Sequence, residues 1–330
     1  MNSSKKIQRW LASGAMAAAL AWLAWGSLLA RDAVPHTGAA PRVHWAAPVA
    51  GLKLHAFETG RMVLDAWAVA VGATGKRVMD QPAYVIEHPV HGLLMFEAGH
   101  HSEIAHDPSE HLGFIHAAGL MPMEQQRGQD ARTQLQQAGF DPDSVRFIVV
   151  SHFHPEHVGA VEEFPNATIV ADAREIDWGR KSPDYNYVPH EYDAVRAWQP
   201  LRFEASKPFS AFPSAHDLFG DGSVLIVSSP GHTPGHVSVA VNLPSGPVLL
   251  TGDVAWSELN VQTATIGLPF VSSDGYEARV SLGQLLRFRD DHPEVLIVPG
   301  HDLGPLRRAA RPDLTVHEWS APGREAIAIR

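Results

Sequence analysis

Four side chains that can bind metal lie within six residues of one another, directly after a short apolar run. The apolar run, residues 147–150, is typical of a buried β-strand, and Pro155 and Gly159 then favour a turn. Imidazole and carboxylate groups are the usual ligands of zinc and related divalent ions. The stretch therefore predicts a metal-binding loop at the edge of a sheet. Its four candidate ligands are His152, His154, Glu156 and His157.

Three later apolar runs end in the same way, with glycine or proline close to a residue that can bind metal. One such ending would be an ordinary cap or surface residue. Four endings in one chain indicate that a single edge of a layered α/β sheet collects these side chains. The later runs are residues 223–228, 247–250 and 295–298, and the residues behind them are His232, His236, Asp253 and His301.

The chain has 330 residues, no cysteine, 20 histidines and a formal net charge of −10. This length is sufficient for one large α/β domain or two modest ones. Without cysteine, any metal must be held by histidine and carboxylate, and thiolate catalysis is excluded. Some histidines cluster by chance at this frequency, but the repeated strand endings argue against chance. The acidic balance matches nucleic acid poorly, since phosphates need clustered lysine and arginine.

The first 30 residues have the pattern of a secretion signal or a membrane anchor. Lys5, Lys6 and Arg9 precede the apolar residues 11–30, a pattern typical of exported proteins. About 20 apolar residues are also enough to span a bilayer. We expect the body to lie outside the cytoplasm, because the positive flank stays inside. The expected organisation is a leader at 1–30, a linker at 31–42, a globular domain at 43–310 and a tail at 311–330.

Helices and further strands are expected around these strand endings. Four histidines between residues 100 and 120 recur every five positions, which does not place them on one helix face. We expect these four, His101, His106, His111 and His116, to be scattered over the surface, and we assign no role to His100 or His190. The aromatic stretch 180–200 is either a surface insert or the wall of a substrate pocket. Helices are predicted at 126–138, 160–164, 173–178 and 274–291, and strands at 93–96 and 168–171.

These motifs resemble the metallo-β-lactamase superfamily, whose pattern is His-x-His-x-Asp-His followed by distant His, Asp and His. Within that superfamily the chain is most similar to the N-acyl homoserine lactone lactonases. The resemblance implies an α/β fold, a four-layer αββα sandwich with the metal site at one sheet edge, here preceded by the apolar leader. It covers roughly residues 52–302, and the segments that support it are 59–65, 230–236, 249–253 and 300–302.

The resemblance also implies a role for each candidate residue. His152, His154 and His232 would hold a first metal ion. A second ion would be held by Glu156, His157 and His301, with Asp253 bridging the two. His236 would support the metal cofactor by orienting a ligand through a hydrogen bond. The expected cofactors are two divalent ions, zinc first, with iron, manganese or cobalt as alternatives.

Three residues depart from the family pattern. Glu156 stands where the family has aspartate, and its extra methylene must be absorbed by a rotamer change, a metal shift or a lost contact. Trp256 stands where the lactonases place a tyrosine that supports the substrate carbonyl, and an indole N–H can only donate. Glu97 replaces a usual aspartate. Asp253, Glu156 and Trp256 are the residues to which we assign catalytic roles.

The implied chemistry is hydrolysis of a lactone or other ester by metal-activated hydroxide. The specific substrate expected is a small molecule, an acyl-homoserine lactone. Alternatives with the same chemistry are hydrolysis of a β-lactam, a thioester or a phosphodiester. The non-enzyme alternative is a membrane-anchored metal-binding protein, since fold alone does not fix function.

Overall fold

A computed structural model describes residues 34–35, 40–113, 123–181, 186–204, 207–268 and 271–319. The predicted leader and most of the predicted linker lie outside these residues. Within the described residues, no helix combines the length and apolar character needed to cross a bilayer.

The described strands form two sheets. In the larger sheet the order is β13-β1-β2-β3-β5-β6-β7, with β4 paired to β1, and in the smaller sheet it is β12-β11-β10-β9-β8. The larger sheet contains β1 (Lys53–Asp65), β2 (Lys76–His88), β3 (Gly92–Phe96), β4 (Met123–Glu124), β5 (Val145–Val149), β6 (Thr168–Asp172), β7 (Trp198–Leu201) and β13 (Leu314–His317). The smaller sheet contains β8 (Ala215–Asp217), β9 (Val224–Ser228), β10 (Val237–Val241), β11 (Val248–Leu250) and β12 (Leu296–Val298).

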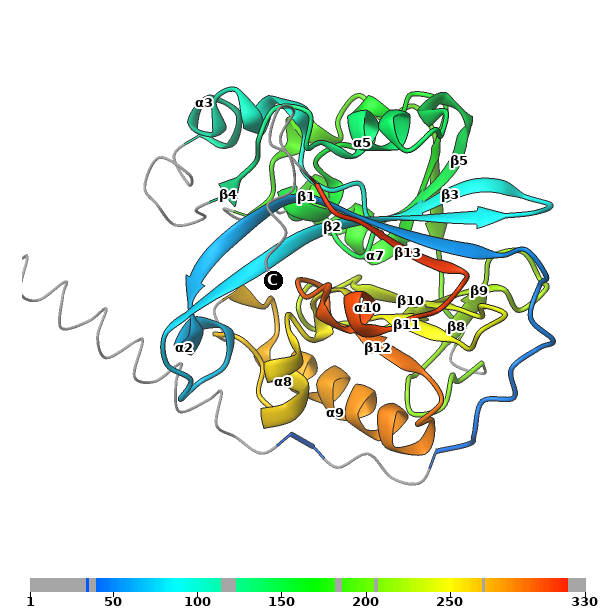
Figure 1. The fold of residues 1–330 in the computed structure, drawn as a ribbon. Coiled ribbons are helices and arrows are strands. Elements are labelled where there is room, and N and C mark those ends of the chain that lie inside the picture. The colour runs from blue at the N-terminus through cyan, green and yellow to red at the C-terminus, as the bar shows by residue number, and fades with distance from the viewer. Residues whose placement is uncertain are drawn as a thin grey trace, which may run out of the picture.

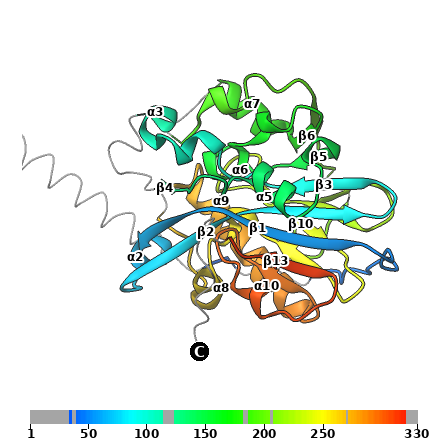
Figure 2. The same ribbon diagram turned by 45° about the horizontal axis from the view of Figure 1, so that its top comes forward.

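Helices cover the outer faces of both sheets, which gives four layers. Figure 1 shows α5 on one side of the paired sheets and α9 on the other, and the turned view in Figure 2 places α7 on the side of α5. The helices are α2 (Ala66–Val69), α3 (Pro108–Leu112), α5 (Ala131–Gln137), α6 (Pro155–Val158), α7 (Ala173–Lys181), α8 (Glu258–Thr263), α9 (Gly275–Asp291) and α10 (Gly304–Arg308). Both sheets mix parallel and antiparallel pairs, so the predicted αββα sandwich is confirmed.

Three apolar layers hold the sandwich together. Side chains of both sheets, such as Phe96 and Val239, meet in the central layer. Leu135 of α5 packs with the outer face of the larger sheet, and Phe288 of α9 packs with that of the smaller sheet. All five residues of β10 are buried, as expected for a strand covered on both faces.

The predicted elements differ from the structure mainly at their ends. Helix α9 and the strands at 93–96 and 168–171 are confirmed. The helix predicted at 126–138 was wrong at its start: α5 begins at Ala131, because the Asp130 side chain accepts the N–H of Thr133 at 2.7 Å and caps the helix there.

The short helix predicted at 160–164 was also wrong. The structure has a 3-10 turn, η3 (Val161–Glu163), and places a helical turn, α6, earlier, inside the predicted metal loop. Pro155 occupies the first turn of α6, where its fixed φ suits a helix start. Helix α7 runs three residues beyond its predicted end.

The C-terminal segment and some of the histidines between residues 100 and 120 also differ from the prediction. Residues 314–317, expected to belong to a tail, form β13, which pairs in parallel with β1. The histidines expected to be scattered are not all so: the rings of His101 and His111 stack with centroids 4.6 Å apart. His111 also bonds Glu191 at 2.9 Å. His106 is exposed, and His116 lies outside the described residues.

Candidate metal centre

Three histidine nitrogens converge at the ends of β5 and β9. Nε2 of His152 lies 2.9 Å from Nδ1 of His154, and that Nδ1 lies 3.2 Å from Nε2 of His232. Nitrogens that bind one zinc ion at about 2.0–2.1 Å in a tetrahedron are about 3.3 Å apart. The three nitrogens therefore have the spacing of ligands to a single ion.

The Asp253 carboxylate lies between this trio and two further histidines. It follows β11 in the 3-10 turn η5 (Gly252–Val254). Oδ2 is 3.2 Å from His232 Nε2, while Oδ1 is 3.4 Å from His157 Nε2 and 3.2 Å from His301 Nε2. A carboxylate in this position can reach two ions at once, one on each side.

Glu156 completes a second group of ligands. One ligand atom each from Glu156, His157 and His301 lies within 4.8 Å of the other two. All seven predicted ligands are buried and belong to one cluster. Glu156, one methylene longer than the family's aspartate, lies in the first turn of α6.

Several buried polar atoms in this cluster have no hydrogen-bond partner within the described residues. They are Glu156 Oε2, Asp253 Oδ1 and both ring nitrogens of His157, of which the His157 and Asp253 atoms do lie at ion-pair distance from neighbouring charged groups. Buried polar groups are almost always paired, and each exception requires an explanation such as an ion. These oxygen and nitrogen atoms carry lone pairs that can bind zinc, iron, manganese or cobalt. The residues present therefore fit a divalent metal centre.

Neighbouring groups orient the histidines of the second group. His301 Nδ1 donates to the carbonyl of Asp80 at 3.0 Å, which directs Nε2 towards Asp253. Nδ1 of His157 lies 3.1 Å from a carboxylate oxygen of Glu97, whose other oxygen accepts the N–H of Ser151. Such contacts fix the tautomer and the ring direction of metal-binding histidines.

His236 lies in the cluster but its ring nitrogens are both engaged. Nδ1 donates to the Ser229 carbonyl at 3.0 Å, and Nε2 accepts the N–H of Asp253 at 2.9 Å. The structure thus places His236 as a support for the bridging aspartate backbone. Gly252 allows this approach: its φ is +52°, and a Cβ there would lie 2.7 Å from His236 Nε2.

Burial and neighbouring charges set the protonation of the cluster. Burial lowers the pKa of His232 to about 3 and holds the pKa values of His152 and His154 well below the usual value. Burial also opposes a charge on His157, but the carboxylates of Glu97 and Asp253 outweigh it and raise the pKa to about 9. The first trio is neutral and presents lone pairs, as metal ligands must.

The sequence interpretation missed Glu175, a fully buried carboxylate on α7. Its two oxygens accept four hydrogen bonds. The donors are the N–H of Phe153 at 3.0 Å, the hydroxyl of Tyr187 at 2.7 Å, the hydroxyl of Thr233 at 2.7 Å and the N–H of Gly235 at 3.1 Å. Phe153 lies between the candidate ligands His152 and His154, and Thr233 follows the candidate ligand His232. Glu175 was missed because a helical glutamate carries no sequence signal of burial.

Two aromatic side chains, Tyr187 and Trp256, lie beside the cluster. The Tyr187 ring lies edge-on to His154 with centroids 5.5 Å apart, so part of the aromatic stretch 180–200 reaches the centre. The Trp256 ring lies 6.1 Å from His232 and 6.4 Å from His301. It packs on an apolar cluster that contains Met62, Val69, Met79, Ile104, Leu112, Met123 and Val188.

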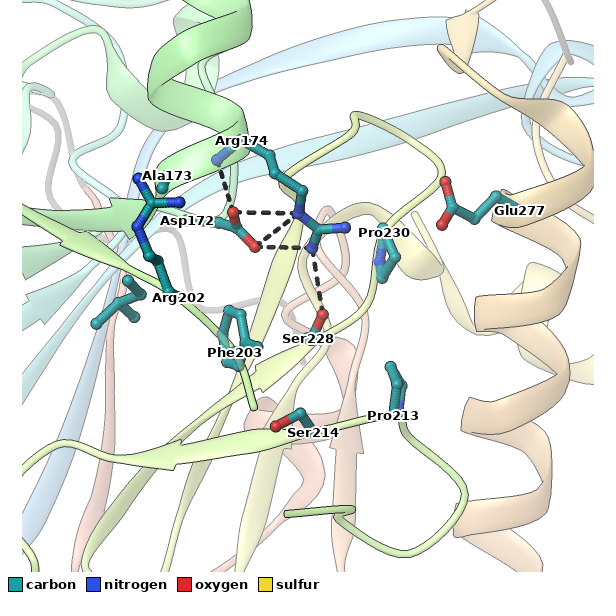
Figure 3. A pocket seen from close by; sticks show the side chains of 11 residues that line it. Asp172, Ala173, Arg174, Arg202, Phe203, Pro213, Ser214, Ser228, Pro230 and Glu277 are labelled. Atoms are coloured by element: carbon teal, nitrogen blue, oxygen red, sulfur yellow. Dashed lines mark hydrogen bonds and ion pairs between the residues drawn. The ribbon is translucent and has the colours of Figure 1, made fainter. Parts of the chain in front are cut away.

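A separate cavity of about 450 Å³ opens beside the start of α7. Figure 3 shows Arg174 paired with Asp172 and reaching Ser228 on its wall. Pro230, which leads into the His232 loop, also lines it. None of the seven predicted ligands lines this cavity.

Residues 77–301 match the model of the metallo-β-lactamase superfamily. The chain belongs to that superfamily, and its predicted family is confirmed. Superfamily membership and lactonase relatives make the chain a metallo-hydrolase.

The curated relatives include N-acyl homoserine lactonases. The lactonase AttM of Azorhizobium caulinodans is 36% identical over 182 residues, which cover 53% of this chain and 65% of that protein. The lactonase AttM of Agrobacterium fabrum is 31% identical over 227 residues, which cover 67% of this chain and 81% of that protein. The match to the Azorhizobium protein thus spans just under two thirds of its length.

Solved lactonases share the fold. An N-acyl homoserine lactone hydrolase with N-hexanoyl-L-homoserine at its catalytic metal centre superimposes with a TM-score of 0.64 at 21% identity, covering 78% of this chain and 96% of that structure. The dizinc lactonase AidC gives a TM-score of 0.57 at 16% identity, covering 82% and 92%.

Proposed function

We propose that this protein hydrolyses the lactone ring of N-acyl homoserine lactones with two divalent metal ions, zinc in the first instance. The observation that carries the proposal is the cluster of seven buried ligands divided around Asp253. The curated lactonases at 31–36% identity support the substrate class.

The ligands divide into two sets in this proposal. His152, His154 and His232 would hold the first ion, and Glu156, His157 and His301 would hold the second, with the Asp253 carboxylate available to both. When bound, such ions polarise a carbonyl and lower the pKa of water. His236 and the Asp80 carbonyl keep the Asp253 backbone and the His301 ring in place while substrate enters.

Proton transfer is the second task of the chain's own residues. Water adds to the lactone carbonyl carbon, the ring C–O bond breaks, and the departing alkoxide needs a proton. Glu156 could carry that proton from the attacking water if only one of its oxygens binds the second ion, because Oε2 has no hydrogen-bond partner within the described residues. The product is a hydroxy acid, which ionises on release.

Trp256 is partly exposed and packs on a buried apolar cluster, so its ring is the apolar surface that could meet an acyl chain beside the candidate ligands. Trp256 occupies the position at which the lactonases have tyrosine, and its indole N–H is a donor without acid or base function. We assign it to packing against the substrate and to donation towards the substrate carbonyl. The Trp256→Tyr variant tests this: lactone hydrolysis should rise if the protein is a diverged lactonase.

A substrate panel tests the proposal. Purified full-length protein with a measured metal content should hydrolyse acyl-homoserine lactones faster than a chromogenic β-lactam, a thioester or a bis-aryl phosphodiester. The γ-lactamase FDB1 of Fusarium pseudograminearum, 29% identical over 188 residues, makes a lactam a necessary member of the panel. Metal-bound protein that is inactive on every substrate would support a binding function instead.

We also propose that the protein is exported and held outside the cytoplasm, with residues 11–30 as signal or anchor. The support is the cationic and apolar pattern of the first 30 residues. Cell fractionation with an epitope at the C-terminus distinguishes soluble exported, membrane-held and cytoplasmic protein.

A further inference from the structure

We infer that Glu175 is a positioning residue for the first metal ion, and that it ties both ligand loops of that ion to one carboxylate. This inference rests on the proposed metal centre. It concerns the first set of ligands, His152, His154 and His232, and leaves the second set unaffected.

The two oxygens of Glu175 serve different loops. Oε1 accepts the N–H of Phe153, whose chain neighbours are His152 and His154. Oε2 accepts hydrogen bonds from the hydroxyl of Thr233 and the N–H of Gly235, which lie one and three residues after His232. The carboxylate therefore fixes the distance between a loop after β5 and a loop after β9, which belong to different sheets.

Close packing supports this arrangement. Glu175 is fully buried, so bulk solvent does not reach the carboxylate that its four donors share. A Cβ added to Gly235 would lie 2.3 Å from the Glu175 backbone nitrogen, so the His232 loop lies directly against α7. Tyr187 donates to Oε1 and places its ring against His154. The carboxylate thus links three segments that surround the first trio.

The second set of ligands has its own supports. Glu97 lies beside His157, and the Asp80 carbonyl accepts from His301. Within the part of the chain that the structure describes, the hydrogen bonds of the Glu175 carboxylate go to Phe153, Tyr187, Thr233 and Gly235, and none goes to Glu156, His157 or His301. A defect at Glu175 should therefore weaken one ion selectively, whereas a general loss of stability would affect both.

Glu175→Gln is the sharpest variant because it keeps the shape of the side chain. An amide offers one acceptor oxygen, and its NH₂ group must face either the Phe153 N–H or the Gly235 N–H. Two donors cannot bond each other, so one of the two loops is released. Loss of groups that orient metal ligands typically costs 10–100-fold in metal affinity.

The experiment measures zinc affinity of the full-length protein by chelator competition in two backgrounds. His301→Ala leaves the first trio intact, and His154→Ala leaves the second set intact. Glu175→Gln should weaken zinc about 10–100-fold in the His301→Ala background and by less than about threefold in the other. Equal losses in both backgrounds, or no loss in the first, would overturn the inference.

A matched control separates positioning from stability. Asp172 accepts the Arg174 N–H at the start of the same helix and pairs with its guanidinium (Figure 3). Asp172→Asn weakens the start of α7 and reaches the loop after β9 only through Arg174 and the Ser228 hydroxyl, without removing a hydrogen bond to Phe153, Thr233 or Gly235, so zinc affinity should stay within about threefold. A loss equal to that of Glu175→Gln would mean that α7 stability alone is responsible.

Two further results complete the test. If Glu175→Gln does not fold, Thr233→Val removes one of the four donors and should give a smaller loss confined to the same background. If the unsubstituted protein binds no zinc, the proposed function fails. If it binds two ions and Glu175→Gln changes neither affinity, only this inference fails.

Discussion

Gly252→Ala should destabilise the bridging aspartate more than an ordinary glycine substitution does. Gly252 has a φ of +52°, and a Cβ there would lie 2.7 Å from His236 Nε2 and 3.0 Å from the Ser151 Cβ. The left-handed conformation costs a non-glycine residue about 1–2 kcal/mol. Displacing His236 also breaks its hydrogen bond from the buried Asp253 N–H, which costs a further ~1–3 kcal/mol. Together the loss is about 2–5 kcal/mol.

The assay is urea unfolding of the full-length protein in a chelator, so that metal binding does not contribute. Gly220 provides the control, since its φ is +77° and a Cβ there meets nothing within 4 Å. Gly220→Ala should cost only the backbone term of about 1–2 kcal/mol. If Gly252→Ala is no more destabilising than Gly220→Ala, and metal content is unchanged, the proposed support of Asp253 by His236 is wrong.

Three other perturbations address the centre and the core. Glu97→Gln removes the carboxylate beside His157 and should lower the zinc affinity of the second site about tenfold or more in chelator competition. An unchanged affinity would show that Glu97 serves only as the acceptor for the Ser151 N–H. Removing metal with a chelator should abolish lactone hydrolysis and lower the melting temperature, and zinc should restore both, whereas full activity after removal would refute metal dependence. Phe288→Ala empties a fully buried position and should cost ~3–5 kcal/mol in urea unfolding while leaving the metal content unchanged; metal loss without destabilisation would contradict the layered core.

The strand endings were predictable because they combine two strong local signals. An apolar run followed by glycine or proline marks a buried strand and its end, and all four runs end in the cluster. Parallel pairing of β5 with β6 and of β11 with β12 aligns strand ends in the same direction. In the smaller sheet β9 and β11 are each antiparallel to β10 and therefore run in the same direction as each other and as β12, so the grouping of His232, Asp253 and His301 follows from sequence pattern and sheet geometry together.

The supports of the centre were not predictable in the same way. In the sequence, Glu175 resembles an exposed glutamate on a helix. It becomes buried only because the loops after β5 and β9 pack against it in the folded protein. Asp80 acts through its backbone carbonyl, which carries no side-chain signal. The start of α5 was misplaced because Asp130 is a stronger helix start than the helix-forming residues before it. These features depend on contacts between segments that are distant in the chain.

The central claim is a two-metal lactone hydrolase, and a zinc titration of metal-free protein tests it most directly. Acyl-homoserine lactone hydrolysis is measured alongside bound zinc per chain as zinc is added. We expect negligible hydrolysis without metal and a maximal rate when both predicted sites are filled. Hydrolysis that is already maximal before zinc is added, or zinc-loaded protein that leaves the lactone ring intact, would contradict it.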